Sequence, residues 1–157
     1  MSPTYPFSND SLPDPAADPL ELKHHHFGVS VPDLEAAIDW YGHVLGFTVE
    51  ARDRLPPVPA NVAFLRRGVL RIELFQPDQG QPLPAERRYP DADLRTHGNK
   101  HVAFAVRDIE AAAAELRQRG ADIVFVKHMP QASVLFLRDN AGNLIELFQQ
   151  PDLWDES

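Results

Sequence analysis

Apolar and polar residues alternate over residues 27–31, and a helical period follows directly after them. Between Leu34 and Leu45 apolar side chains recur every three or four positions, which places them on one face of a helix. Asp33 is a good N-cap for this helix, and Gly46 is a suitable residue to end it. Three alternating runs follow, so the first half predicts one strand, one helix and then strands at 47–51, 61–65 and 69–75, with a stiff proline-rich loop at 55–59.

The second half of the chain repeats this order. His101-Val102-Ala103-Phe104 matches His26-Phe27-Gly28-Val29 at a distance of 75 positions, and Ile72–Gln76 returns residue for residue as Ile145–Gln149. This half predicts a strand at 101–106, a helix between Asp108 and Gly120, strands at 122–127, 133–137 and 144–149, and a hairpin turn at 139–143. The repeat is too long for a solenoid. We therefore expect an α+β fold of two tandem βαβββ modules around a pseudo-twofold axis.

Proline and charge mark the segments outside the two repeats. Residues 1–22 are proline-rich and predict an extended arm, and residues 151–157 form a short acidic tail. Between them we expect one domain at 23–150, with module 1 at about 23–76, a linker or lid at 77–99 and module 2 at about 100–150. The linker is either a solvated connection or a loop that covers a substrate and offers an arginine to an anionic group. It contains Arg87, Arg88, Tyr89, Arg95 and His97.

Composition narrows the class of protein. The chain has 15 Lys and Arg against 23 Asp and Glu, a formal net charge of −8, which argues against nucleic acid as a partner. It has no cysteine, and therefore no disulfide framework and no thiolate metal site. No apolar run reaches the roughly 18 residues of a membrane span, and no secretory signal is visible. We expect a cytoplasmic protein that acts on a small molecule without contacting a membrane.

A histidine begins the first strand of each module, and a glutamate lies inside the last one. His26 and Glu73 in module 1 correspond to His101 and Glu146 in module 2. Each glutamate stands between aliphatic residues in a strongly apolar strand, where an unpaired carboxylate facing a cavity would be costly. A lone glutamate on a solvated strand face is ordinary, but four residues at equivalent positions of a duplicated module are not. Two imidazoles and two carboxylates would balance a divalent ion, with half of the site from each module.

The remaining histidines show no such correspondence. His24, His43 and His128 have no counterpart in the other module and are interpreted as residues of the surface or of a pocket rim. His25 adjoins a predicted ligand, but it points to the opposite face if the strand begins there.

Three groups of residues resemble one known superfamily over nearly all of residues 23–149. They are His26-Phe27-Gly28-Val29-Ser30-Val31-Pro32-Asp33-Leu34-Glu35 with Trp40-Tyr41 and Leu45-Gly46-Phe47, then Gly98-Asn99-Lys100-His101-Val102-Ala103-Phe104, then Phe136-Leu137-Arg138-Asp139-Asn140-Ala141-Gly142-Asn143-Leu144-Ile145-Glu146. In these the chain resembles the vicinal oxygen chelate superfamily of glyoxalases, bleomycin resistance proteins and extradiol dioxygenases. The resemblance implies mixed sheets that curl around a metal, commonly in a homodimer. It implies His26, Glu73, His101 and Glu146 as ligands, the four that the repeat selects independently.

Differences from the residues typical of individual superfamily members indicate which members this chain resembles most and which substrate it does not bind. His26, His101 and Glu146 resemble the ferrous site of extradiol dioxygenases, whereas Glu73 resembles the glyoxalase and epimerase branch, although methylmalonyl-CoA epimerases typically have glutamine there. Ser30 stands where glyoxalase I usually has arginine, and Pro77 stands where an asparagine is expected, which argues against glutathione as a substrate.

The sequence therefore predicts a metal-dependent isomerase or lyase that moves a proton next to a carbonyl. Glu146 or Glu73 would act as general base or acid, and Mn, Fe, Co, Ni or Zn would suit the mixed ligands. Two alternatives stay open at this point: an Fe(II) extradiol-type dioxygenase, and a non-catalytic binding or resistance protein of the same fold.

Overall fold

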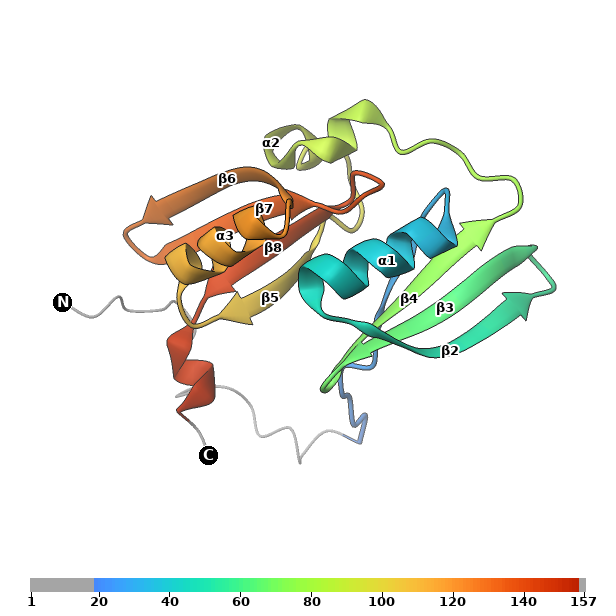
Figure 1. Ribbon diagram of the computed structural model, residues 1–157, viewed down its shortest axis with the longest axis horizontal. Helices are drawn as coiled ribbons and strands as arrows, with labels where there is room; N and C mark the ends of the chain where they lie inside the picture. Colours follow the sequence, from blue (N-terminus) through green and yellow to red (C-terminus); the bar gives the residue numbers. More distant parts are fainter. Residues whose placement is uncertain (1–18, 156–157) are drawn as a thin grey trace.

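The computed structural model describes residues 19–155 and contains two βαβββ units in tandem (Figure 1). The first unit consists of β1 (Phe27–Ser30), α1 (Leu34–Leu45), β2 (Thr48–Leu55), β3 (Ala60–Arg67) and β4 (Leu70–Pro77). The second consists of β5 (Val102–Val106), α3 (Ile109–Gln118), β6 (Asp122–Met129), β7 (Ala132–Arg138) and β8 (Leu144–Gln149). Two short helices, η2 (Ala85–Arg88) and α2 (Pro90–Asp93), lie in the linker, and η3 (Pro151–Trp154) follows the second unit.

Each unit forms its own four-stranded mixed sheet. The strand orders are β1-β4-β3-β2 and β5-β8-β7-β6, and in both sheets the first strand runs parallel to the last while the other pairs are antiparallel. This confirms the predicted α+β class and the tandem modules. The sheets are not closed, because no strand of one sheet pairs with a strand of the other within residues 19–155.

Both long helices begin and end where the sequence predicts. Asp33 caps α1 by accepting a hydrogen bond from the Ala36 amide at 3.0 Å, and Gly46 ends the helix with a φ of 72°, a left-handed conformation that costs glycine little. In the second module Asp108 accepts hydrogen bonds from two amides of the first turn of α3. The faces that these helices bury belong to one continuous core.

In the repeated sequence Ile-Glu-Leu-Phe-Gln, the first, third and fifth side chains face the helix of their own module. In β4, Ile72 and Leu74 are fully buried, and the next side chain on that face, Gln76, accepts a hydrogen bond from the Leu34 amide at 2.7 Å. Gln149 does the same for the Ile109 amide at 2.8 Å. Each final strand therefore binds the beginning of its own helix on one face and presents its glutamate on the other.

Some strands extend further than predicted. β2 continues to Leu55 and β6 to Met129, so the proline-rich loop expected at 55–59 is a turn of residues 56–59. Leu55 pairs with Ala60 across this turn, and the ladder ends there because Pro56 cannot donate to it. His26 and His101 each lie one residue before their strands instead of beginning them.

Side-chain contacts join the two modules on the side of the helices. The Tyr41 hydroxyl of α1 donates to Asp139 Oδ2 at 2.9 Å, and Arg119 donates to the Val44 carbonyl at 2.9 Å. In Figure 1 both long helices lie in front of their sheets. Phe27 of β1 and Phe104 of β5 also meet, with ring centroids 5.8 Å apart.

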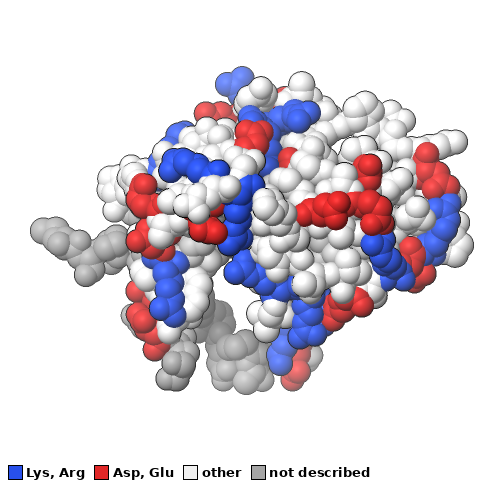
Figure 2. All heavy atoms as spheres, viewed as in Figure 1, with Lys and Arg blue, Asp and Glu red and all other residues white. Residues whose placement is uncertain are grey.

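The predicted terminal segments are only partly described. Of the proline-rich arm at 1–22, residues 1–18 lie outside the described residues, as do residues 156–157 of the predicted tail. No helix in the described part of the chain is long and apolar enough to cross a membrane. On the face shown in Figure 2, acidic and basic side chains are interspersed.

Candidate active site

The first pair of predicted site residues, His26 and Glu73, meets where β1 pairs with β4 in the first sheet. His26 precedes β1, and Glu73 stands in the middle of β4, opposite Gly28 on one side and Phe64 on the other. The His26 Nε2 atom lies 2.9 Å from Glu73 Oε2. The Phe64 ring stands edge-on to the imidazole, with centroids 5.4 Å apart, and restricts its orientation.

The second pair repeats this arrangement in the second sheet. His101 precedes β5, and its Nε2 atom lies 2.8 Å from Glu146 Oε2 in β8. Glu146 is flanked by Ala103 and Phe136, and the Phe136 ring stands edge-on to His101 with centroids 4.9 Å apart. The equivalence inferred from the repeat therefore extends to the contacts of the side chains.

Both carboxylates are largely withdrawn from solvent. The side chain of Glu73 is 17% exposed and that of Glu146 is 15% exposed. Among the described residues, each carboxylate is bonded only to its own histidine. A carboxylate that is this shielded and has a single partner gains from a nearby cation, because burial without full compensation is costly.

The donor set of these residues fits a divalent transition metal. Imidazole nitrogen and carboxylate oxygen together suit Mn, Fe, Co, Ni and Zn. The structure brings the four residues together as two pairs, however, and within residues 19–155 no three His, Asp or Glu side chains are close enough to hold one ion. One ion bound by all four would require the two pairs to meet, so the four-ligand centre stays a prediction.

A cleft of about 1730 Å³ contains both histidines. His26 and His101 line it together with residues of β1 and β5, and the linker supplies much of the remaining wall. The linker residues that line the cleft are Pro77, Asp78, Gly80, Gln81, Pro82, Leu83, Pro84, Arg87, Arg88, Asn99 and Lys100. The linker thus borders the two histidines, whereas neither Glu73 nor Glu146 is among the residues that line the cleft.

A buried carboxylate fixes the shape of the linker. Asp93 is 1% exposed and accepts hydrogen bonds from Arg87 Nε at 3.0 Å and from Lys100 Nζ at 3.3 Å. Lys100 also donates to the backbone carbonyls of Asp93 and Thr96. Because Lys100 directly precedes His101, this cluster joins the linker to the second His–Glu pair. Nothing in the sequence singles out Asp93 among the many acidic residues.

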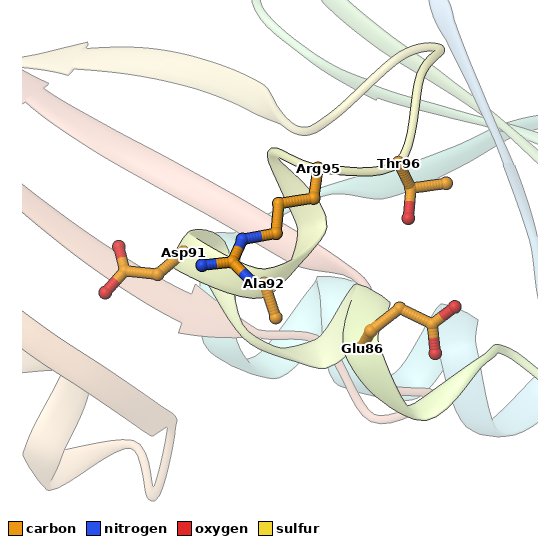
Figure 3. A pocket seen from close by; sticks show the side chains of 5 residues that line it. All are labelled: Glu86, Asp91, Ala92, Arg95 and Thr96. Atoms are coloured by element: carbon orange, nitrogen blue, oxygen red, sulfur yellow. The ribbon is translucent and has the colours of Figure 1, made fainter.

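A second hollow, of about 510 Å³, lies on the linker itself (Figure 3). It is lined by Glu86, Asp91, Ala92, Arg95 and Thr96 and contains neither histidine of the predicted site. Arg95, one of the linker arginines that the sequence brings forward, therefore borders this hollow and not the cleft.

The other histidines are placed as follows. His128 lies exposed on β6, 2.7 Å from Glu110 and 2.9 Å from the Ser133 hydroxyl. The Nδ1 atom of His25 lies 2.6 Å from that of His26, and the condition under which His25 is expected to face away, a strand that begins there, is not met. The strand begins only at Phe27, and alternation does not apply to the residues before it.

Asp139 is a buried carboxylate that joins the two modules. It is buried in the turn before β8, where it accepts hydrogen bonds from Tyr41, Ala141 and Asn143. Burial, followed by the charge of Asp139 and the hydrogen bond to it, raises the pKa of Tyr41 well above its ordinary value. The sequence identifies the turn but carries no signal for the partner 98 positions away.

Comparison with known proteins agrees with this architecture. Residues 25–136 match the model of the Glyoxalase/Bleomycin resistance protein/Dioxygenase superfamily. An ethylmalonyl-CoA/methylmalonyl-CoA epimerase of Cereibacter sphaeroides is 31% identical over 132 residues, covering 80% of this chain and 96% of that protein. The mitochondrial methylmalonyl-CoA epimerase of Homo sapiens is 28% identical over 131 residues, covering 80% of this chain and 72% of that protein.

A solved structure shows the same likeness in three dimensions. The crystal structure of the glyoxalase family protein from Enterococcus faecalis superposes with a TM-score of 0.68 at 26% identity, covering 81% of this chain and 97% of that one. With its paired βαβββ modules and the match over residues 25–136, the chain belongs to the glyoxalase/bleomycin resistance protein/dioxygenase superfamily.

Proposed function

We propose that this protein is a metal-dependent epimerase of 2-alkylmalonyl thioesters. The observation that carries the proposal is the equivalence of Glu73 and Glu146, each bonded to a histidine at the same place of its module. The epimerases of Cereibacter sphaeroides and Homo sapiens support the reaction class, because their names specify inversion of an alkylmalonyl-CoA. The carbon inverted in such a thioester lies between two carbonyl groups, where a proton is acidic enough to be removed.

Two carboxylates suit this chemistry. Epimerisation removes a proton from one face of a carbon and returns a proton to the opposite face. Glu73 and Glu146 come from separate modules; one would accept the proton at an Oε atom as a carboxylate, and the other, in its protonated form, would donate one. The histidine beside each carboxylate orients it, and the phenylalanine beside each histidine limits the movement of the pair.

A divalent ion is part of the proposal. His26, Glu73, His101 and Glu146 would hold it, by the two imidazole nitrogens and the carboxylate oxygens. When bound, such an ion supplies positive charge beside a carbonyl oxygen as negative charge develops there. An acyl group held beside His26 and His101 would then lie in the cleft that these histidines and the linker line.

Glu73 distinguishes this chain from the methylmalonyl-CoA epimerases that it resembles, in which glutamine is typical at this position. A glutamine can orient a substrate but cannot accept a proton at neutral pH. The second carboxylate gives this chain a base in each module. The name of the Cereibacter sphaeroides epimerase adds ethylmalonyl-CoA to the substrates to be tried.

Stereochemical conversion tests the proposal. The protein is stripped with a chelator, reloaded separately with Mn, Fe, Co, Ni or Zn, and mixed with one C2 epimer of methylmalonyl-CoA or ethylmalonyl-CoA. We expect the other epimer to appear with at least one metal, and no conversion with the stripped protein. Oxygen uptake with a catechol and ferrous iron, without any epimerisation, would contradict the proposal and support a dioxygenase.

A further inference from the structure

In the described part of the chain, the guanidinium of Arg88 in the wall of the cleft has no counter-ion. Arg88 ends the linker helix η2 and lines the same cleft as His26 and His101. The neighbouring Arg87 is bound to Asp93 and to the Asn99 carbonyl. Within residues 19–155, by contrast, no carboxylate or carbonyl is bonded to the side chain of Arg88.

The position of Arg88 is defined by contacts with the second module. Its backbone carbonyl accepts a hydrogen bond from Arg138 Nε at 2.7 Å. The guanidinium lies over the turn before β8, where Gly142 has no side chain. A Cβ atom added to Gly142 would lie 2.7 Å from the Cζ and Nε atoms of Arg88. The bare backbone at Gly142 is therefore what allows the guanidinium to occupy this place.

The charges around Arg88 leave this wall of the cleft positive. Arg87 and Lys100 share the single carboxylate of Asp93, so that cluster keeps one excess positive charge. The carboxylate of Asp78 on the opposite part of the linker is already bound by both terminal nitrogens of Arg54. In a chain with a formal net charge of −8, such a wall attracts anions into the cleft.

We propose that Arg88 binds an oxyanion of the ligand, a carboxylate or a phosphate, and so determines which molecules the cleft accepts. A guanidinium offers two parallel N–H donors to a carboxylate or phosphate, a geometry that lysine cannot reproduce. Arg88 is a specificity residue here and takes no part in moving the proton. The inference rests on the proposed function only for its choice of an acyl-CoA ligand.

Equilibrium binding tests this without requiring turnover. Malonyl-CoA, malonate and inorganic pyrophosphate are titrated separately into the wild-type protein and into R88A, R88K and R95A. Malonyl-CoA has no stereocentre to invert, and Arg95 is a linker arginine that borders the other hollow (Figure 3). We expect R88A to weaken malonyl-CoA binding about tenfold or more, R88K to weaken it less, and R95A to leave it unchanged.

The two smaller probes identify the group that Arg88 holds. If R88A weakens the binding of malonate, the group that Arg88 binds is a carboxylate. If R88A weakens the binding of pyrophosphate, that group is a phosphate. Equal binding by the wild type and R88A, equal weakening by R88A and R95A, or no binding of any probe by the wild type would each overturn the proposal.

A glycine substitution tests the position of the guanidinium. G142A places a methyl group where Arg88 now lies, so the side chain must move away. G120A is the matched control, since Gly120 also has a positive φ, 73° against 92° for Gly142, but has no atom within 4 Å of the added Cβ. We expect G142A to reproduce the loss seen in R88A and G120A to bind as the wild type does. Unchanged malonyl-CoA binding by G142A would show that the Arg88 guanidinium does not bind the ligand from its place beside Gly142.

The same measurements distinguish a failure of the proposed function from a failure of the inference about Arg88. Arg88-dependent binding without epimerisation would leave the oxyanion site standing and the proposed function wrong. Epimerisation with the same KM in the wild type and R88A would leave the proposed function standing and this inference wrong.

Discussion

Glu73 and Glu146 have matching surroundings in two sheets that share no strand pairing. Each stands between a small residue and a phenylalanine of its own sheet, and each is bonded through an Oε2 atom to the Nε2 atom of a histidine. This equivalence supports the proposal that both pairs serve one reaction.

Metal content gives a first prediction. We expect one divalent ion per chain, and we expect that removal of either pair, as H26A/E73A or H101A/E146A, abolishes binding, because two ligands alone hold such an ion weakly. Elemental analysis after gel filtration measures this. The control is H128A/E110A, which removes an exposed His–Glu pair with a contact of 2.7 Å. Metal content that is halved by each double variant would show two separate sites and contradict a shared one.

Most of the fold could be predicted from the sequence because its signals are local. The apolar period of α1, its Asp33 cap and the left-handed Gly46 act over a few residues, and the repeat supplies the same elements again. The His–Glu pairs could be predicted for the same reason, as equivalent positions of the two copies.

Contacts between distant segments could not be predicted. The bond between Tyr41 and Asp139 and the cluster around Asp93 depend on how the modules and the linker pack, which no local pattern encodes. The repeated Gln76 and Gln149 carried a signal, but their role in binding the helix ends became apparent only with the strands in place. The sequence also could not predict that the two His–Glu pairs lie apart.

The hydroxyl of Tyr41 gives a prediction about stability. Y41F removes its hydrogen bond to the Asp139 carboxylate, which keeps its three other donors. We expect the free energy of unfolding in urea to fall by about 1.5–3 kcal/mol, the usual range for hydrogen bonds to charged groups. Y89F is the control, since Tyr89 is exposed. A loss no larger than that of Y89F would mean that this bond does not hold the modules together.

The raised pKa of Tyr41 adds a pH dependence. The unfolded chain releases this proton at about the ordinary value of 10.0, whereas the folded protein holds it to higher pH. The stabilisation is therefore complete well below pH 10 and is lost progressively as the pH rises above it, by up to about 1.4 kcal/mol per unit between the unfolded-state and folded-state pKa values. The free energy of unfolding of the wild type should fall more steeply than that of Y41F over this range. Parallel curves would contradict a buried, protonated Tyr41.

Asp93 gives a prediction about the linker. D93N leaves Arg87 and Lys100 without their shared carboxylate, and we expect a loss of about 2–3 kcal/mol, less than for a fully buried pair because both cations are partly exposed. Trypsin should then cleave after Arg88 and Arg95 faster than in the wild type, as the linker opens more often. The control is D91N, whose carboxylate is exposed. Equal cleavage rates in D93N and D91N would show that Asp93 does not fix the linker.

Exchange of the substrate proton with solvent tests whether each glutamate acts as a base. Each C2 epimer of methylmalonyl-CoA is incubated with the metal-loaded protein in deuterium oxide, and NMR follows deuterium at the carbon between the two carbonyl groups. We predict incorporation from both epimers in the wild type. In E73Q and in E146Q we predict loss of interconversion, with exchange retained for one epimer only and a different one in each variant. Interconversion that survives in either variant, or no incorporation by the wild type with any of the five metals, would contradict the account.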